Sequence, residues 1–188
     1  MSRSELRFSG FGGQGVITMA HVLGHAASVH AGMNAAMTEA YGPEKTGGFS
    51  RADLVLSDEV INYPNVVEPN VFVAFSQDAF ERDADSVAQD GLVIVERDLV
   101  DPSSLLEYWH AEEVVTVPAV SIAQDIGLKV IANIVMLGAT VELSEVVEPS
   151  AVKKAIFDIV PDGTEDLNEA AFDRGRKALD APEGEVVR

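Results

Sequence analysis

Residues 6–15 read LRFSGFGGQG, and this stretch predicts a strand that turns sharply into a helix. Residues 6–9 suit a short strand, and residues 16–31 carry apolar side chains at helical spacing. The glycines between them are costly to order unless the chain must turn sharply or let something approach its backbone. Free backbone N–H groups and the helix dipole at such a turn favour a phosphate. The candidate binding residues are therefore Gly10, Gly12, Gly13, Gln14 and Gly15.

The glycine run also fits the pattern G-x-G-x-x-G on Gly10, Gly12 and Gly15. Glu39 follows near the end of a second expected strand at 34–38. This arrangement resembles the fingerprint of dinucleotide-binding domains, in which the acidic residue binds a ribose. A tight strand-to-helix turn without a ligand explains the same residues at least as well.

The segment that follows departs from an ordinary nucleotide-binding domain. Residues 38–64 read TEAYGPEKTGGFSRADLVLSDEVINYP, so a Gly- and Pro-rich loop stands where a crossover helix would be expected. Together with GFGGQG at 10–15 and VIANIVMLGA at 130–139, it closely resembles the gamma subunit of 2-oxoacid:ferredoxin oxidoreductases. The 2-oxoglutarate type, or a related branched-chain type, fits better than the pyruvate type, and the resemblance covers roughly residues 4–180. The family often has Arg just before its Gly-Gly pair, where this chain has Thr46, preceded by Lys45.

The resemblance implies a complex that decarboxylates a 2-oxoacid on thiamine diphosphate and Mg, passes electrons through iron–sulfur clusters to ferredoxin, and transfers the acyl group to coenzyme A. It implies alpha and beta subunits that carry the thiamine cofactor, with clusters in beta or in a small ferredoxin-like delta chain. This chain alone would hold no cofactor, no metal and no catalytic residue. Its role would be assembly, with the glycine turn helping to hold coenzyme A, and the isolated chain would be inactive. The expected interface or active-site loop comprises Tyr41, Gly42, Pro43, Glu44, Gly47, Gly48, Ser50 and Arg51.

Composition excludes several functions. The 188 residues include no cysteine, so thiolate ligation of a cluster, a disulfide and a cysteine nucleophile are excluded. The net charge of −18 argues against nucleic acid and anionic membranes as partners and fits a cytoplasmic location. No secretory signal is expected, and the apolar run at 130–141 is too short to span a bilayer. Residues 8–38 lack Asp, Glu, Lys and Arg, which indicates either core or a surface covered by another protein.

Short apolar runs predict strands that are buried on both faces, because they do not alternate with polar residues. These runs lie at 52–56, 71–75, 92–95 and 114–117. Helices are expected at 76–88, 129–146, 150–157 and 164–178, with a short one at 103–107. Ser150 and Thr164 are the expected caps of the last two long helices. The fold class is α/β: a three-layer sandwich with a largely parallel sheet and a helical C-terminal third, forming a single domain over 1–180 and a frayed tail at 181–188.

Other chemistry has weaker support. His21 and His25 share a helical face, but no third metal ligand stands at a telling spacing, so packed or exposed histidines are favoured. Asp53, with Asp58 and Glu59 nearby, is favoured as a structural residue over an acid–base pair, and Ser50 has no neighbouring His to activate it. Two other functions stay open: a stand-alone nucleotide-binding or regulatory domain, and, ranked last, an NAD-dependent enzyme.

Overall fold

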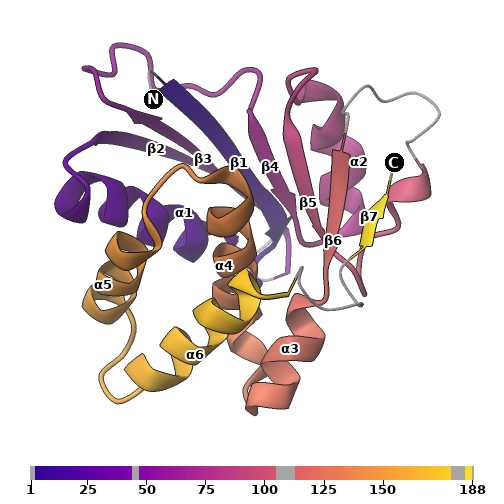
Figure 1. The fold of residues 1–188 in the computed structure, drawn as a ribbon. Helices are drawn as coiled ribbons and strands as arrows, with labels where there is room; N and C mark the ends of the chain where they lie inside the picture. Colours follow the sequence, from indigo (N-terminus) through magenta and orange to yellow (C-terminus); the bar gives the residue numbers. More distant parts are fainter. Residues whose placement is uncertain (1–2, 44–46, 105–112, 179–184, 188) are drawn as a thin grey trace.

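One mixed sheet organises the computed structural model, which describes residues 3–43, 47–104, 113–178 and 185–187 (Figure 1). Within these residues the strand order is β2-β3-β1-β4-β5-β6-β7. The strands are β1 (Arg3–Phe11), β2 (Asn34–Tyr41), β3 (Phe49–Ser57), β4 (Val71–Ala74), β5 (Leu92–Glu96), β6 (Glu113–Val117) and β7 (Glu185–Val187). The helices are α1 (Val16–His25), α2 (Gln77–Asp83), α3 (Ala119–Ile126), α4 (Ala132–Ser144), α5 (Pro149–Ile159) and α6 (Glu165–Arg176). Shorter turns are the π-helix η1 (Ala26–His30) and the 3-10 turns η2 (Ala84–Ser86), η3 (Pro102–Ser104) and η4 (Lys129–Ile131).

The centre of the sheet is parallel and its margins are antiparallel. β1, β4, β5 and β6 are parallel neighbours. β3 runs antiparallel to β1, and β2 antiparallel to β3. β2 and β3 are antiparallel because the loop that joins them after Tyr41 is too short for the long crossover that a parallel pair needs, and it forms a hairpin connection instead. The α/β class is confirmed, but the sheet is mixed, with three parallel and three antiparallel pairings among the described strands, where a largely parallel sheet was expected.

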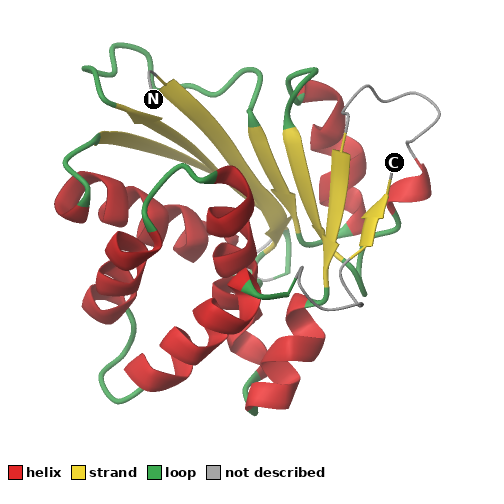
Figure 2. Ribbon diagram, viewed as in Figure 1, coloured by secondary structure: helices red, strands yellow, loops and turns green. Residues whose placement is uncertain are grey.

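Helices cover both faces of the sheet, which explains the unbroken apolar runs (Figure 2). Val71 and Val73 of β4 join the large core with α1 and α4, whereas Phe72 joins the smaller core with Phe80 of α2. A strand with helices on both faces buries successive side chains in opposite directions, so every position is apolar. The expected three layers are therefore present.

The helical C-terminal third is held together by a close crossing of α4 and α6. Ten successive residues of α4, Ala132 to Val141, are buried, as expected for a helix that is apolar all round. Gly138 lies against the backbone of Phe172, and Gly175 lies against the backbone of Val135. A Cβ at either glycine would overlap a main-chain carbonyl of the other helix.

Several element ends differ from the sequence-based expectation. The α-helix expected over 16–31 ends at His25 and continues as the π-helix η1. Ser150 is not a cap, because α5 begins at Pro149, whose missing N–H suits a first helical position. Thr164 occupies the cap position of α6, but its hydroxyl makes no capping bond with a backbone N–H of the helix. It donates to the carbonyl of Pro161 at 2.7 Å and accepts from the side chain of Asn168 at 3.1 Å.

The expectation of a tail at 181–188 needs correction within the described residues. Glu185–Val187 form β7 and pair antiparallel with β6. This pairing covers the main-chain groups that β6 would otherwise present as an open edge, and consecutive valines favour a strand. The expected short helix at 103–107 is described only as far as Ser104, where η3 ends; its remainder lies outside the described residues. No helix in the described ranges is long and apolar enough to cross a membrane.

Candidate functional site

The two glycine motifs meet at one end of the sheet. The N–H of Gly12 donates to the carbonyl oxygen of Gly48 at 2.7 Å. The antiparallel register of β1 and β3 places Phe11 opposite Phe49, so the turn after β1 starts beside the loop that precedes β3. A Cβ on Gly12 would lie 3.5 Å from the nitrogen of Gly47, which shows how closely the two backbones approach. Residues more than 30 positions apart thus form one surface.

The turn after β1 has the backbone geometry that its glycines predict. Gly13 and Gly15 have φ values of 97° and 78°, which residues other than glycine rarely adopt. The side-chain amide of Gln14 stabilises the turn through two hydrogen bonds. Its Oε1 accepts from the N–H of Phe11 at 2.6 Å, and its Nε2 donates to the carbonyl of Phe75 at 3.0 Å. The amide of Gln14 therefore holds β1 to β4, and the turn can offer mainly backbone groups to a ligand.

The N-terminus of α1 opens beside this turn. Its cap residue is Gly15, no side chain caps the helix, and no acidic residue lies in its first turn. A helix end with these properties carries partial positive charge from its free N–H groups. Asn133 of α4 completes this corner, with its Nδ2 3.4 Å from the carbonyl oxygen of Gly15. A cavity of about 770 Å³ lies here. Its walls include Gly12, Gly13, Gly15, Thr18, Tyr41, Gly42, Gly47, Gly48, Ser50, Val130 and Asn133.

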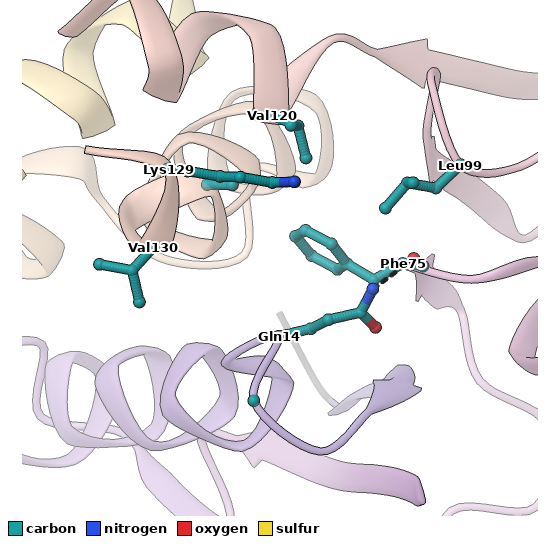
Figure 3. A pocket seen from close by; sticks show the side chains of 8 residues that line it. Gln14, Phe75, Leu99, Val120, Lys129 and Val130 are labelled. Carbon is teal, nitrogen blue, oxygen red and sulfur yellow. Dashed lines mark hydrogen bonds between the residues drawn. The ribbon is translucent and has the colours of Figure 1, made fainter. Parts of the chain in front are cut away.

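A second cavity, of about 510 Å³, shares Gly13 and Val130 with the first. Its walls are Gly13, Gln14, Phe75, Leu99, Val120, Lys129, Val130 and Ala132, and Figure 3 shows the side chain of Lys129 extending between Val120 and Phe75. Phe75 follows β4, Leu99 follows β5 and Val120 follows β6, so the cavity lies beyond the carboxyl ends of the parallel strands. Ligands of open α/β sheets bind at this edge.

Glu96 holds together two segments that line this second cavity. Its side chain is fully buried at the end of β5. One carboxylate oxygen accepts from the N–H of Val120 at 3.1 Å, and the other accepts from the N–H of Asp98 at 2.8 Å. Burial raises the pKa of Glu96, although these N–H groups oppose the shift. The carboxylate thus ties the start of α3 to the loop that carries Leu99.

The chemistry of the walls suits an anion with apolar parts. The described residues that line the two cavities include one cation, Lys129, and no carboxylate, imidazole or thiol. Backbone N–H groups and a lysine attract phosphate, and the absence of acidic neighbours in these walls leaves that attraction unopposed. No pair of groups for nucleophilic or general acid–base catalysis is present among these wall residues.

The residues expected in the interface loop take different positions. Tyr41, Gly42, Gly47, Gly48 and Ser50 all line the larger cavity. Pro43 lies beside them in the sequence but is not a wall residue, and Glu44 lies outside the described residues.

Arg51 is not a wall residue of either cavity. It makes an ion pair with Asp83 at 3.4 Å, and its guanidinium lies 5.9 Å from the ring centre of Phe49. Arg82 packs on the same ring at 3.7 Å. The guanidinium of Arg51 therefore belongs to the α2 face of the sheet.

The acidic residue does not lie where a dinucleotide-binding domain would need it. Glu39 lies on β2, and β3 separates β2 from β1. In a dinucleotide-binding domain the acidic residue follows the strand next to the first one, within reach of the ribose. The carboxylate of Glu39 instead accepts a hydrogen bond from the hydroxyl of Tyr41, and this bond raises the pKa of the Tyr41 phenol.

Asp53 has the structural role that its pattern favours. It forms an ion pair with Arg7 at 2.8 Å, and its side chain is almost wholly buried. Asp58 and Glu59 are exposed beyond the far end of β3, so they do not form a carboxylate pair with it.

Lys129 and Asn133 are the site residues that sequence reasoning missed. Both lie in a segment interpreted only as the start of a buried helix, and a long-range packing contact between α4 and α1 brings them to the glycine turn. The motif at 130–139 was the available signal, since it includes Asn133 and begins one residue after Lys129.

Comparisons with known proteins agree on one group. The family model for pyruvate ferredoxin/flavodoxin oxidoreductase matches residues 5–178. The 2-oxoglutarate synthase subunit KorC of Methanocaldococcus jannaschii is 41% identical over 174 residues, covering 92% of this chain and 92% of that protein. The gamma subunit of keto/oxoacid ferredoxin oxidoreductase from Geobacter sulfurreducens has a TM-score of 0.83 at 32% identity, covering 96% of this chain and 99% of that chain. The 2-oxoglutarate:ferredoxin oxidoreductase of Magnetococcus marinus, solved with 2-oxoglutarate, coenzyme A and succinyl-CoA bound, shares the fold with a TM-score of 0.83 at 22% identity, covering 96% of this chain and 31% of that chain.

Proposed function

Because the chain belongs to the pyruvate ferredoxin/flavodoxin oxidoreductase family, we propose that it works as the gamma subunit of a heteromeric 2-oxoacid:ferredoxin oxidoreductase acting on 2-oxoglutarate. Its similarity over nearly the full length of a 2-oxoglutarate synthase subunit supports this choice of acid. The partners in this proposal are alpha and beta subunits, a small ferredoxin-like delta subunit, and ferredoxin as electron acceptor, in the cytoplasm. Thiamine diphosphate, Mg and the iron–sulfur clusters belong to the partners, which agrees with the absence of cysteine from this chain.

The role of this chain within the complex is to hold coenzyme A beside the active site. The meeting of Gly12 and Gly48 next to the uncapped N-terminus of α1 is the observation that carries this role. Backbone N–H groups of the turn and the ammonium of Lys129 would bind phosphates of coenzyme A, and the apolar walls around Phe75 suit its less polar parts. Coenzyme A would supply the thiol that accepts the acyl group, and the residues of this chain would bind and orient it.

Co-purification tests the subunit assignment. The chain should co-purify with alpha and beta subunits, and the complex should reduce a viologen dye with 2-oxoglutarate, coenzyme A and thiamine diphosphate. The isolated chain should give no reduction above the blank in the same assay. Turnover by the isolated chain would exclude the assignment, and a chain that binds no partner but binds adenine nucleotides tightly would favour a stand-alone nucleotide-binding domain.

Lys129→Met tests the binding role in the reconstituted complex. Methionine keeps the length and apolar stem of the side chain and removes its charge. The KM for coenzyme A should rise roughly tenfold, as expected for the loss of one charged hydrogen bond, and the KM for 2-oxoglutarate should change little. Lys154→Met is the matched control, because Lys154 is an exposed lysine on α5 that lines neither cavity. Equal effects of the two substitutions would show that Lys129 acts only through net charge.

A further inference from the structure

His25, His30 and Asp158 converge at a place remote from the glycine turn. The Nε2 atoms of His25 and His30 lie 3.1 Å and 2.7 Å from the same oxygen of Asp158. The two imidazole rings meet edge to face, with centres 5.6 Å apart. One ligand atom from each residue lies within 4.8 Å of the other two. His21, the partner that helical spacing predicts for His25, is not among these residues.

The π-helix explains why these two histidines meet. Residues five apart in an α-helix point about 140° away from each other, so an unbroken α1 would separate His25 from His30. The chain instead forms a π-helix over Ala26–His30, directly after His25. A π-helix repeats every five residues along its hydrogen bonds, so it returns residue 30 to the side of residue 25. Such widened turns are rare and are frequently found at functional sites.

Asp158 completes the cluster from a different helix. It lies on α5, which packs against the π-helix. The imidazoles of His25 and His30 both lie within hydrogen-bond distance of one oxygen of its carboxylate. Its side chain is 47% exposed, against 29% for His25 and 19% for His30, so solvent reaches the group from one side.

We propose that His25, His30 and Asp158 bind a divalent transition-metal ion, with zinc as the ion whose geometry fits best. Two imidazole nitrogens and one carboxylate oxygen are a common three-ligand set for zinc, and water occupies the fourth position. Donor atoms in a tetrahedral zinc site lie about 3.3 Å apart, so the 3.1 Å separation of His25 from Asp158 fits, and the 2.7 Å separation of His30 from Asp158 would widen when the ion binds. Metal binding requires the imidazole tautomer that carries its proton on Nδ1, so that Nε2 presents a lone pair to the ion.

The bound ion would fasten the π-helix to α5. The π-helix leads directly into β2, the edge strand of the sheet, so the metal would hold the start of that strand in place. This role is separate from the proposed binding of coenzyme A, because the cluster shares no residue with either cavity at the glycine turn.

Zinc titration of the full chain, with any affinity tag removed and metal stripped by chelator, tests the proposal. We expect one ion per chain by calorimetry and, with cobalt as a probe, an absorption spectrum typical of tetrahedral coordination. At zinc concentrations 100 times Kd the Tm should rise by roughly 5–10 °C. His30→Gln and Asp158→Asn should each weaken binding at least tenfold.

His21→Gln is the control that separates this site from surface binding. His21 lies one helical turn before His25, so an adventitious pair would use His21 and His25. The proposal requires that His21→Gln leave zinc affinity unchanged. It is overturned if no stoichiometric ion binds, if His21→Gln weakens binding as much as His30→Gln does, or if His30→Gln has no effect. Circular dichroism without metal verifies folding of each variant, and Asp158→Asn on the half-exposed face of α5 replaces His30→Gln if the latter does not fold.

Discussion

Arg7 and Asp53 face each other across β1 and β3 and form a two-pronged ion pair. Nε of Arg7 lies 2.8 Å from one carboxylate oxygen of Asp53, and Nη2 lies 3.0 Å from the other. Both residues are nearly inaccessible, at 5% and 6% exposed. Arg7 also donates to the carbonyl of Val66 and to the hydroxyl of Ser86, so it joins β1 to three separate segments.

Arg7→Met should therefore destabilise the fold strongly. It leaves the carboxylate of Asp53 buried with Arg51, at 3.8 Å, as its remaining ion-pair partner among the described residues, and removing one partner of a buried ion pair costs about 3–5 kcal/mol. The double substitution Arg7→Met with Asp53→Leu removes both charges and should recover a large part of the loss. Urea unfolding of the three proteins measures this. A single substitution that costs under about 1 kcal/mol would show that water reaches the pair.

Glu96→Gln should change how stability depends on pH. Burial raises the pKa of Glu96 above its ordinary value of 4.5. At a pH between 4.5 and this raised pKa, the folded chain keeps a proton on Glu96 that the unfolded chain has lost. The unfolding free energy of the original protein therefore contains a contribution that falls as pH rises through this interval. Glutamine does not titrate. The unfolding free energy of the original minus that of the variant should fall from about pH 4 upward and then level off.

Urea unfolding of both proteins at a series of pH values provides the measurement for Glu96. Working with the difference between the two proteins removes the contribution of the other titrating groups. A difference that stays constant, or that grows as the pH rises, would mean that the hydrogen bonds from Val120 and Asp98 outweigh burial.

Gly13→Val should combine strain with a loss of ligand affinity. A β-branched residue at φ 97° is strained by roughly 1–3 kcal/mol, although nothing lies within 4 Å of the added Cβ. Gly32→Val is the matched control, since Gly32 also has positive φ, at 69°, and equally open space. Both variants should lower the Tm, and only Gly13→Val should raise the KM for coenzyme A in the complex. If the two variants leave that KM equally unchanged, the glycine turn has a purely structural role.

Gly138→Ala should destabilise the chain far more than Gly24→Ala. The added methyl group at Gly138 would meet the backbone of Phe172, so α4 and α6 would have to move apart. At Gly24 the nearest atom is the flexible end of Leu54 at 3.1 Å, and alanine gains up to about 1 kcal/mol of helix propensity there. Thermal unfolding compares the two. Similar Tm values would mean that the α4–α6 crossing adapts easily.

The strands were the most predictable part of this fold. Runs such as Val71–Ala74 lie between two helical layers, so both faces of the strand are buried and every residue in it is apolar. Strand direction was less predictable, because whether β3 pairs with β1 in parallel or antiparallel depends on the loop after Tyr41. The π-helix was not predictable from spacing, since its residues fit a regular α-helix equally well.

The candidate site was predictable only in its local parts. The glycines of both motifs stand out as candidates in the sequence, and the positive φ of Gly13, Gly15 and Gly47 agrees with the backbone requirement that glycine indicates. Lys129 shares a cavity with Gly13, and Asn133 contacts Gly15, because α4 packs against α1, and that packing does not follow from helical spacing. The position of Arg51 was missed for a related reason: its partner, Asp83, comes from α2 on the other face of the sheet.

The hydrogen bond from Gly12 to Gly48 also makes the two loops mechanically dependent on each other. If a neighbouring subunit docks on the loop around Gly48, as the proposed function implies, it would also shift the turn that precedes α1, because a main-chain hydrogen bond of 2.7 Å joins them. Assembly and ligand affinity would then be coupled in both directions: whatever tightens the grip on a ligand at Gly13 also strengthens the attachment of the neighbour, by the reciprocity that governs any two linked binding events.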